Sequence, residues 1–395
     1  MGVLSTGRAA KRVLAGKGRR LKEALAGECY RIRGKIGFFR LLLLAVLAGF
    51  AALILEGRIL SGDDALMPQK RAAGALMKRA CKTIKEKRLS LGLAIDPRTD
   101  PNETGLIGSE YTDLTTTMGS LSAKRTSTQP LFAGVIVDML GQAGVGEGDN
   151  VAICFSGSFP ALNIGVLAAV KVLGAKPFII SSVGASMYGA NDPEMTWLDM
   201  EEALRDAGLF PFRSLAASLG GITETEGGLD GTGIDRGMAA IRRNRIPYLD
   251  EGKDGDLAAD INNRLRLYDR ALGGERPAAF VNVGGASVAL GRCRQALHLA
   301  SGFMMRVPIS TSPERGLIFR MAERRVPVIH LLNIHRLASR YGLPLDPCPF
   351  PDEFGMLDIS GRLKRRLYQT MGILAAMILF GLVVEVAGRQ GPGPA

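Results

Sequence analysis

Short apolar runs alternate with longer amphipathic runs through the middle of the chain. The short runs predict strands at 151–155, 177–182, 214–219, 246–249, 278–283 and 326–332. Apolar positions three and four residues apart predict helices at 67–91, 131–143, 160–173, 197–207, 235–244, 257–272 and 315–324. Apolar strands that alternate with amphipathic helices are typical of a mostly parallel sheet with helices on both faces. The predicted fold class is therefore α/β.

Small and hydroxyl-bearing residues follow four of the predicted strands, in the segments 156–158, 181–186, 220–221 and 282–287. The carboxyl ends of parallel strands share one edge of a sheet, and ligands of open α/β sheets bind beyond that edge. Four such turns would line a shallow polar crevice with backbone amides. We therefore expect the ligand site of this domain at the carboxyl edge of the sheet.

The clearest local chemistry lies in the segment 150–163, NVAICFSGSFPALN, which reads as strand, tight turn and helix. This geometry directs backbone N–H groups at an anion. The turn is neither GxSxG, nor a Walker A loop, nor GxGxxG. Three interpretations remain open for Ser156, Gly157 and Ser158: an anion-binding cradle, a compact structural turn, or a serine nucleophile. Asn163 follows as a cap of the helix or as a ligand contact.

Other polar residues extend the list of candidate ligand-binding positions. Lys124 and Arg125, within the hydroxyl-rich segment 115–130, suit carboxylates or phosphates, although the same segment also reads as a solvated loop. The remaining candidates come from the segments that follow the predicted strands: Ser182, Ser186, Tyr188, Asn191, Asn282, Gly284 and Gly285.

Histidine and cysteine positions give no sign of a metal or of a catalytic triad. The histidines are His298, His330 and His335, and the last two are five residues apart, which does not suit one helical face. A lone histidine in an apolar run, such as His330, is more often a core residue. The five cysteines form no CxxC motif. We expect no metal and no cofactor, and the sequence leaves open whether the protein is an enzyme.

Two uncharged apolar segments, 41–55 and 367–384, predict transmembrane helices. The alternative for each is a buried core helix. The predicted organisation is a basic cytoplasmic tail (1–37), a transmembrane helix (38–60), an α/β domain (61–361), a second transmembrane helix (367–387) and a short tail (388–395). The protein is thus expected in a membrane, in contact with the lipid bilayer.

The positive charge is concentrated before the first predicted span. Residues 1–40 hold eleven Lys and Arg against two Glu, which accounts for +9 of the net charge of +12. A basic tail beside a membrane helix typically stays in the cytoplasm and contacts anionic lipid. The tail carries one aromatic residue before Phe38, so base stacking and nucleic-acid binding are not favoured. We expect cytoplasmic termini and an extracytoplasmic central domain, although the basic cluster 362–366 argues against this orientation.

Several long segments resemble one known family. They are TGLIGSEYTDLTTTMGSLSAKRTSTQP (104–130), SGSFPALN (156–163), SSVGASMYGANDPEMTWLDME (181–201), SLAASLGG (214–221) and VNVGGASVALG (281–291). Together they resemble the poly-gamma-glutamate system protein family, bacterial membrane proteins encoded alongside the poly-gamma-glutamate synthase and its export partners. The resemblance covers roughly 67–343 and both predicted spans.

The resemblance implies a process and not a reaction, because it brings no catalytic residues. It implies a bacterial cell-membrane protein of poly-gamma-glutamate (capsule) biosynthesis, whose partners are the synthase and export membrane proteins and an anionic polymer. The favoured hypothesis is a membrane-anchored α/β accessory protein that binds this polymer or its end at the sheet edge. The alternatives are a serine-dependent amide hydrolase or transferase using Ser156 or Ser158, and a catalytically idle scaffold of the synthase complex.

Overall fold

The computed structural model describes residues 65–220, 228–249 and 256–351, together with Gly49 and Gly372. The chain divides into two compact units, Met1–Gly62 with Arg365–Ala395 and Asp63–Lys364, and the three described ranges belong to the second. Apart from those two glycines, the predicted spans and both predicted tails lie outside the described residues. Among the residues that are described, no helix is long and apolar enough to cross a bilayer.

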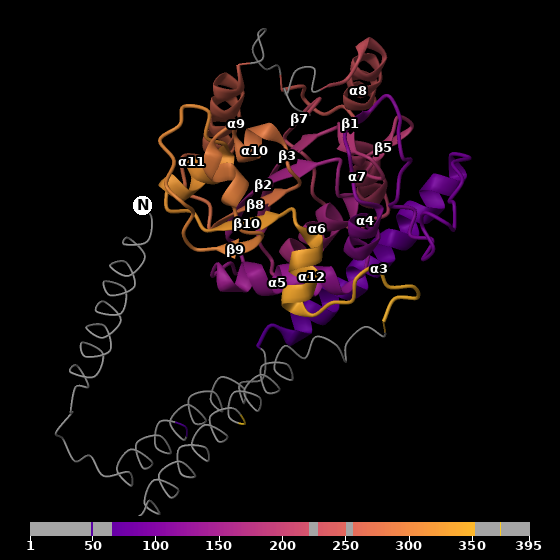
Figure 1. Cartoon of the computed structure of the whole chain (residues 1–395), viewed down its shortest axis with the longest axis horizontal. Helices are drawn as coiled ribbons and strands as arrows, with labels where there is room; N and C mark the ends of the chain where they lie inside the picture. The colour runs from indigo at the N-terminus through magenta and orange to yellow at the C-terminus, as the bar shows by residue number, and fades with distance from the viewer. Residues whose placement is uncertain (1–48, 50–64, 221–227, 250–255, 352–371, 373–395) are drawn as a thin grey trace, which may run out of the picture. The chain divides into compact units, whose positions relative to one another are not determined.

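A six-stranded sheet lies at the centre of the domain, in the order β7-β3-β2-β8-β10-β9 (Figure 1). Its strands are β2 (Asn150–Ser156), β3 (Lys176–Ser182), β7 (Ala216–Ser218), β8 (Ala279–Val283), β9 (Gly302–Met304) and β10 (Val328–Leu331). All neighbours pair in parallel except β9, which runs antiparallel to β10 at the edge. The mostly parallel α/β sheet predicted from the apolar pattern is therefore confirmed.

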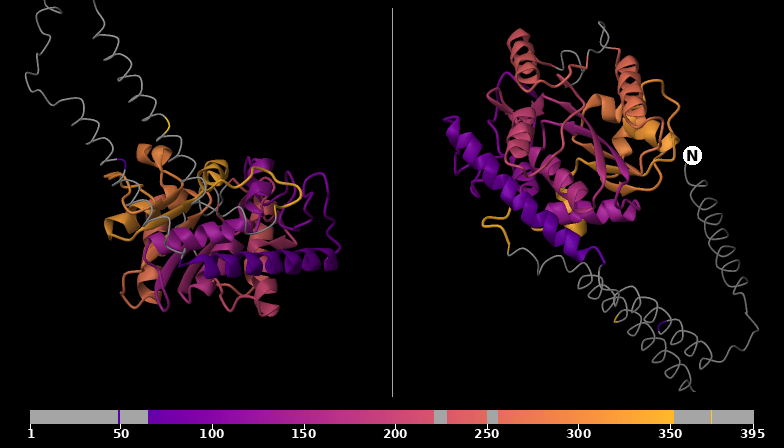
Figure 2. Two further views of the ribbon diagram at one scale, coloured as in Figure 1. Left: turned by 90° about the horizontal axis from the view of Figure 1, so that it is seen from below. Right: turned by 180° about the vertical axis from the view of Figure 1, so that it is seen from behind.

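Helices cover the sheet on both faces (Figures 1 and 2). The larger core packs the sheet against α3 (Met67–Ser90), α5 (Leu131–Gln142), α6 (Pro160–Val172), α7 (Trp197–Asp206), α8 (Gly231–Arg243) and α12 (Ile334–Tyr341). The smaller core packs it against α9 (Leu257–Ala271), α10 (Ser287–Leu290) and α11 (Leu317–Glu323).

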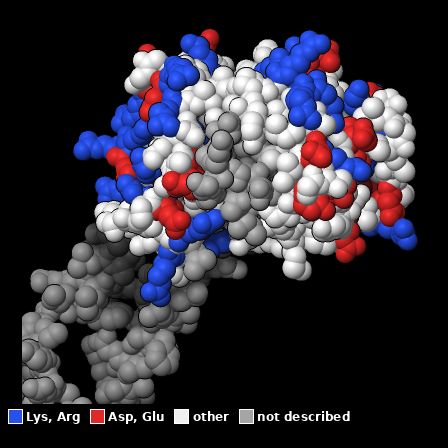
Figure 3. Space-filling view, turned by 90° about the horizontal axis from the view of Figure 1, so that it is seen from above, with Lys and Arg blue, Asp and Glu red and all other residues white. Residues whose placement is uncertain are grey.

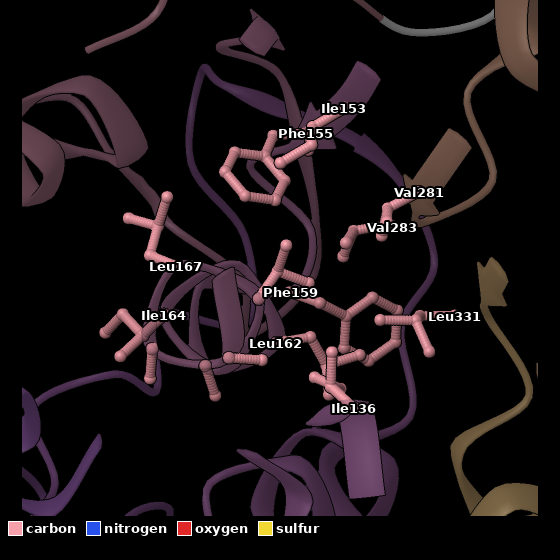
Figure 4. Packing of buried hydrophobic residues seen from close by; sticks show 14 of the residues in the cluster. Ile136, Ile153, Phe155, Phe159, Leu162, Ile164, Leu167, Val281, Val283 and Leu331 are labelled. Atoms are coloured by element: carbon pink, nitrogen blue, oxygen red, sulfur yellow. The ribbon is translucent and has the colours of Figure 1, made fainter. Parts of the chain in front are cut away.

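The central strand β2 shows why the chain forms this layered structure. Val151, Ile153 and Phe155 lie in the larger core, whereas Ala152 and Cys154 lie in the smaller one. Side chains alternate across a strand, so a strand buried on both faces must be apolar throughout. In Figure 4, Ile153 and Phe155 face the apolar side chains of α6.

The structure departs from the sequence expectations in three places. The predicted strand 246–249 makes only an isolated bridge, between Tyr248 and Ala217. The segment 115–130 is not a solvated loop, because it forms strand β1 (Thr115–Thr117) and helix α4 (Leu121–Ser127). The short elements β4 (Ala185–Ser186), β5 (Asn191–Asp192), β6 (Met195–Thr196), β9, α10 and η1 (Arg294–His298) and the longer α12 had no predicted counterpart.

Tertiary contacts account for the structure of 115–130. Strand β1 pairs in parallel with β4, which lies directly after β3. Helix α4 begins at a Ser120 cap whose hydroxyl accepts a hydrogen bond from the Ala123 N–H at 3.3 Å. Serine and threonine are weak helix formers in isolation, so packing decides the structure of this segment.

A buried carboxylate lies beneath the sheet. The side chain of Glu201 accepts hydrogen bonds from the Ser214 N–H at 3.0 Å and from its hydroxyl at 2.8 Å. The Ser214 hydroxyl is in turn 2.7 Å from that of Ser181, which accepts the indole N–H of Trp197 at 3.3 Å. Burial raises the pKa of Glu201 from 4.5 to about 7, more than the bonds from Ser214 lower it.

We expect Glu201 to make stability fall with rising pH. Because its folded-state pKa lies above its ordinary value, its contribution is full below pH 4.5 and is lost as pH rises through about 7. In Glu201→Gln the amide oxygen can accept the Ser214 N–H and the amide nitrogen can donate to the Ser214 hydroxyl, and the side chain carries no charge, so its melting temperature should change less between pH 5 and 8. Glu202→Gln is the control. The hydrogen bond from Arg205 lowers the pKa of Glu202, so removing this carboxylate should not reduce the fall of stability near pH 7. Equal pH slopes for Glu201→Gln and the unmodified protein would contradict this assignment.

Candidate functional site

A pocket of about 350 Å³ lies at the carboxyl edge of the sheet. The turns after β2, β3 and β8 form one part of its wall, as the sequence predicted for three of the four small-residue turns. Two further segments complete the wall: 116–124, which runs from β1 into α4, and 332–335, at the start of α12. Seven hydroxyl-bearing residues line it: Thr116, Thr117, Ser120, Ser156, Ser158, Ser182 and Ser186.

Lys124 is the buried amine of this pocket. Its side chain is 2% exposed, and its Nζ donates a hydrogen bond to the Ser186 Oγ at 2.7 Å. The same Nζ donates to the Ser158 carbonyl and lies 4.0 Å from the centre of the Phe159 ring. The two hydrogen bonds use two of the three protons of an ammonium group. Lys124 thus ties the turn after β2 to the turn after β3.

The charge of Lys124 has no acidic partner among the described residues. Burial lowers the pKa of Lys124 from 10.5 to about 7, and desolvation is the one cause that acts on it. The described residues that line the pocket include no Asp and no Glu. A lysine with this pKa is about half neutral at pH 7 and can take up or release a proton near neutrality.

Two serine hydroxyls and two backbone N–H groups form a hydrogen-bonded chain beside Lys124. The Ser158 Oγ accepts the Ser186 N–H at 3.0 Å and the hydroxyl of Ser156 at 3.1 Å. The Ser156 Oγ accepts the Ser158 N–H at 3.1 Å. Both lone pairs of the Ser158 oxygen are therefore used, and its remaining group is its own proton, which has no acceptor among the described residues. Ser158 lines the pocket, so it is positioned to donate to a bound oxygen.

Two glycines allow the turns to approach this closely. A Cβ on Gly284, where φ is +92°, would lie 2.9 Å from the Ser156 Cβ. A Cβ on Gly189 would lie 2.8–2.9 Å from the carbonyl oxygens of Gly157, Ser158 and Ser186. The backbone can pack around the serines because these positions carry no side chain.

His335 gives the pocket a second basic group. It lies at the start of α12, is half-buried, and its Nε2 is 3.2 Å from the Ser122 Oγ of α4. His330, five residues earlier, is instead 1% exposed, and its Nδ1 is 2.9 Å from the Asn282 Nδ2. Burial lowers the pKa of His330 to about 4. The interpretation of His330 as a core residue thus agrees with the structure.

Six of the sequence-predicted site residues line the pocket: Ser156, Ser158, Ser182, Ser186, Lys124 and Gly285. The others do not, and most of them support its walls. Asn163 is buried and donates to the Ser156 carbonyl at 3.0 Å, and Asn191 is buried between Ser109 and Thr115.

The remaining candidates also have structural surroundings. Asn282 donates to the Gly284 carbonyl at 2.8 Å, and the N–H of Gly157 donates to the Ser182 carbonyl at 3.0 Å. Arg125 pairs with Asp346 at 3.5 Å. Tyr188 has a positive φ of 60° and lies outside the pocket lining.

Sequence reasoning did not identify Thr116, Phe159, Asn333 and His335 as pocket residues. The one available signal was that Asn333 directly follows a predicted strand, as the identified serines do. Among the described residues, no group of three or more His, Cys, Asp and Glu is arranged to hold a metal.

The described part of the face shown in Figure 3 carries no continuous basic track. Lys and Arg form separate clusters there, with Asp and Glu among them. No protein-family model, curated protein or solved structure matches this chain.

Proposed function

We propose that the domain binds the carboxylate-bearing end of an anionic γ-linked glutamate polymer in the strand-end pocket. In this proposal the chain is a membrane-anchored accessory protein of poly-gamma-glutamate synthesis or export in the bacterial cell membrane. The resemblance of the segments between 104 and 291 supports the process, and the chemistry of the pocket supports the ligand.

The composition of the pocket wall carries the proposal. Its described lining combines two basic side chains, Lys124 and His335, with seven hydroxyls and no carboxylate. Such a wall favours an anion over a cation, because each ionisable side chain in it is basic and none can carry a negative charge. The Ser158 proton supplies a directed donor for a ligand oxygen.

The size of the pocket favours a chain end. Ligand sites for small molecules occupy about 300–1,000 Å³, and this pocket lies near the lower limit with about 350 Å³. A few glutamyl units fit such a volume, whereas a long polymer needs an extended groove.

Calorimetry of the full chain in detergent with γ-linked triglutamate tests this proposal. We expect one ligand per chain, and we expect Ser158→Ala to bind about 10- to 100-fold more weakly, because it loses a hydrogen bond to a charged group. Ser339→Ala, at an exposed position on α12, is the matched control and should bind normally. Undetectable binding at millimolar ligand, or equal affinity of Ser158→Ala, would overturn the proposal.

Affinity for the anion should fall as pH rises through about 7. The cationic form of Lys124 attracts a carboxylate, and this form is lost above the pKa of Lys124, which burial lowers to about 7. Titrations between pH 5.5 and 8.5 measure the effect. Lys124→Met should bind weakly at every pH in this range, and a pH-independent affinity of the unmodified protein would contradict a role for Lys124.

A further inference from the structure

The contact between Lys124 and Ser186 has the geometry of a base and its nucleophile. The two side-chain atoms are 2.7 Å apart, and both residues line the pocket. Serine is a weak nucleophile unless a neighbouring base takes its proton. Among the described serines of the pocket, Ser186 is the one whose hydroxyl contacts Lys124.

Lys124 can act as that base because its amine is kept from full protonation. It is buried without an acidic partner among the described residues, and burial lowers its pKa to about 7. A neutral Nζ has one lone pair, and the Ser186 hydroxyl lies where it can donate to it. A general base is most effective when its pKa is near the working pH.

We propose that Ser186 and Lys124 form a serine–lysine acyl-transfer centre for an amide or ester carbonyl bound in the pocket. This goes beyond ligand binding and does not depend on which polymer binds. The sequence leaves a nucleophile at Ser156 or Ser158 as one of three open interpretations, whereas the structure assigns this role to Ser186.

The reaction needs water or an amine as its second reactant. Ser186 Oγ attacks the carbonyl carbon while neutral Lys124 takes the hydroxyl proton. The C–N or C–O bond of the substrate then breaks, and the leaving amine or alcohol takes the proton from Lys124. Water or an acceptor amine attacks the resulting ester and gives a proton to Lys124. The bond from the acyl carbon to Ser186 breaks, and this proton returns to the Ser186 oxygen.

Ser158 has a defined place in this chemistry. Its oxygen holds the Ser186 N–H at 3.0 Å, and its own proton is left for a ligand oxygen. A donor at this position stabilises the charge that develops on the carbonyl oxygen in the tetrahedral intermediate. Ser158 therefore serves both proposals, as a donor either to a carboxylate or to an oxyanion.

A fluorophosphonate probe tests the centre directly, because it reacts with activated serines without any polymer. The full chain in detergent is incubated with the probe, and the adduct is located by peptide mass spectrometry. We expect one adduct, on Ser186. We expect the labelling rate to rise between pH 6 and 8 with a midpoint near 7, opposite to the expected pH dependence of anion binding.

Two lysine variants separate a base from a structural cation. Lys124→Met should label at least about 100-fold more slowly, in the range of general-base effects. Lys124→Arg keeps the positive charge but cannot serve as a base near pH 7, so it should be equally slow if its melting temperature is close to that of the unmodified protein. Ser339→Ala should label normally.

Several results would overturn the acyl-transfer centre: no adduct, an adduct on Ser156 or Ser158, or normal labelling of Lys124→Arg. These outcomes differ from failure of the proposed function, which calorimetry with γ-linked triglutamate measures on Ser186→Ala. If triglutamate binds but the probe does not label Ser186, the proposed function stands and the acyl-transfer centre is wrong. If the probe labels Ser186 but triglutamate does not bind, the acyl-transfer centre stands and its substrate is a different one.

Discussion

Gly189→Ala is expected to slow the labelling of Ser186 strongly while leaving most of the fold intact. The added methyl would lie 2.8–2.9 Å from three backbone carbonyl oxygens, those of Gly157, Ser158 and Ser186. Each of these oxygens already accepts a hydrogen bond and cannot move away cheaply, so the turns after β2 and β3 must separate. We expect a loss of about 1–3 kcal/mol in stability, typical of overpacking, and labelling at least about 100-fold slower.

Gly231→Ala is the matched control for this substitution. Gly231 begins α8, and a Cβ there would meet no atom within 4 Å. Alanine at such a position is expected to be neutral or slightly stabilising, because it restricts the unfolded chain. Circular dichroism and thermal unfolding report the fold, and probe labelling reports the pocket. Normal labelling of Gly189→Ala would show that the close approach of the two turns is not needed for the Ser186–Lys124 contact.

Phe155→Ala is expected to cost about 3–5 kcal/mol, the largest loss of stability that we predict for a single substitution. Phe155 is 1% exposed on the central strand, and its ring meets that of Trp197 at 5.4 Å with an interplanar angle of 82°. The substitution removes a large buried side chain and an edge-to-face aromatic pair, and leaves a cavity between β2 and the helices beneath it (Figure 4).

Tyr111→Ala removes an aromatic side chain that is 75% exposed, and should change stability by less than about 0.5 kcal/mol. Phe155→Leu should fall between the two, because leucine fills part of the space. Denaturant unfolding of the three variants measures the differences. A loss below about 1 kcal/mol for Phe155→Ala would mean that the core between β2 and α6 closes around the gap.

The central fold could be predicted because the strands are buried on both faces. A run such as Val151–Phe155 has no polar position, and its alternation between two cores follows from strand geometry. Edge elements lack this signal. Strand β9 has three residues and is defined by its pairing with β10, and the segment around Tyr248 makes one bridge to the short β7.

Part of the site could be predicted for a similar reason. Ser156, Ser158, Ser182, Ser186 and Gly285 follow parallel strands, and the carboxyl ends of such strands share one edge. Sequence pattern cannot show a contact that depends on tertiary packing between distant segments.

Lys124 is the example with the largest consequence. It lies 34 residues from Ser158 and 62 residues from Ser186, and no local pattern links them. In the sequence, its position within a hydroxyl-rich segment is equally consistent with a lysine on a solvated loop. The pairing of β1 with β4 places it under the pocket and removes it from water. Its chemistry is therefore a property of the folded domain.

The late position of α12 in the chain has a consequence for how the domain is assembled. Ser122 on α4 contacts His335, and Thr126 accepts the Asp346 N–H at 2.9 Å, across sequence separations of 213 and 220 residues. Contacts over such separations form late, because long stretches of chain must first be ordered. A growing polypeptide therefore contains Lys124 long before it contains the segment that anchors α4. The Lys124 amine and the Ser186 hydroxyl would therefore meet late in folding. A nascent chain that ends before α12 would lack part of the pocket wall.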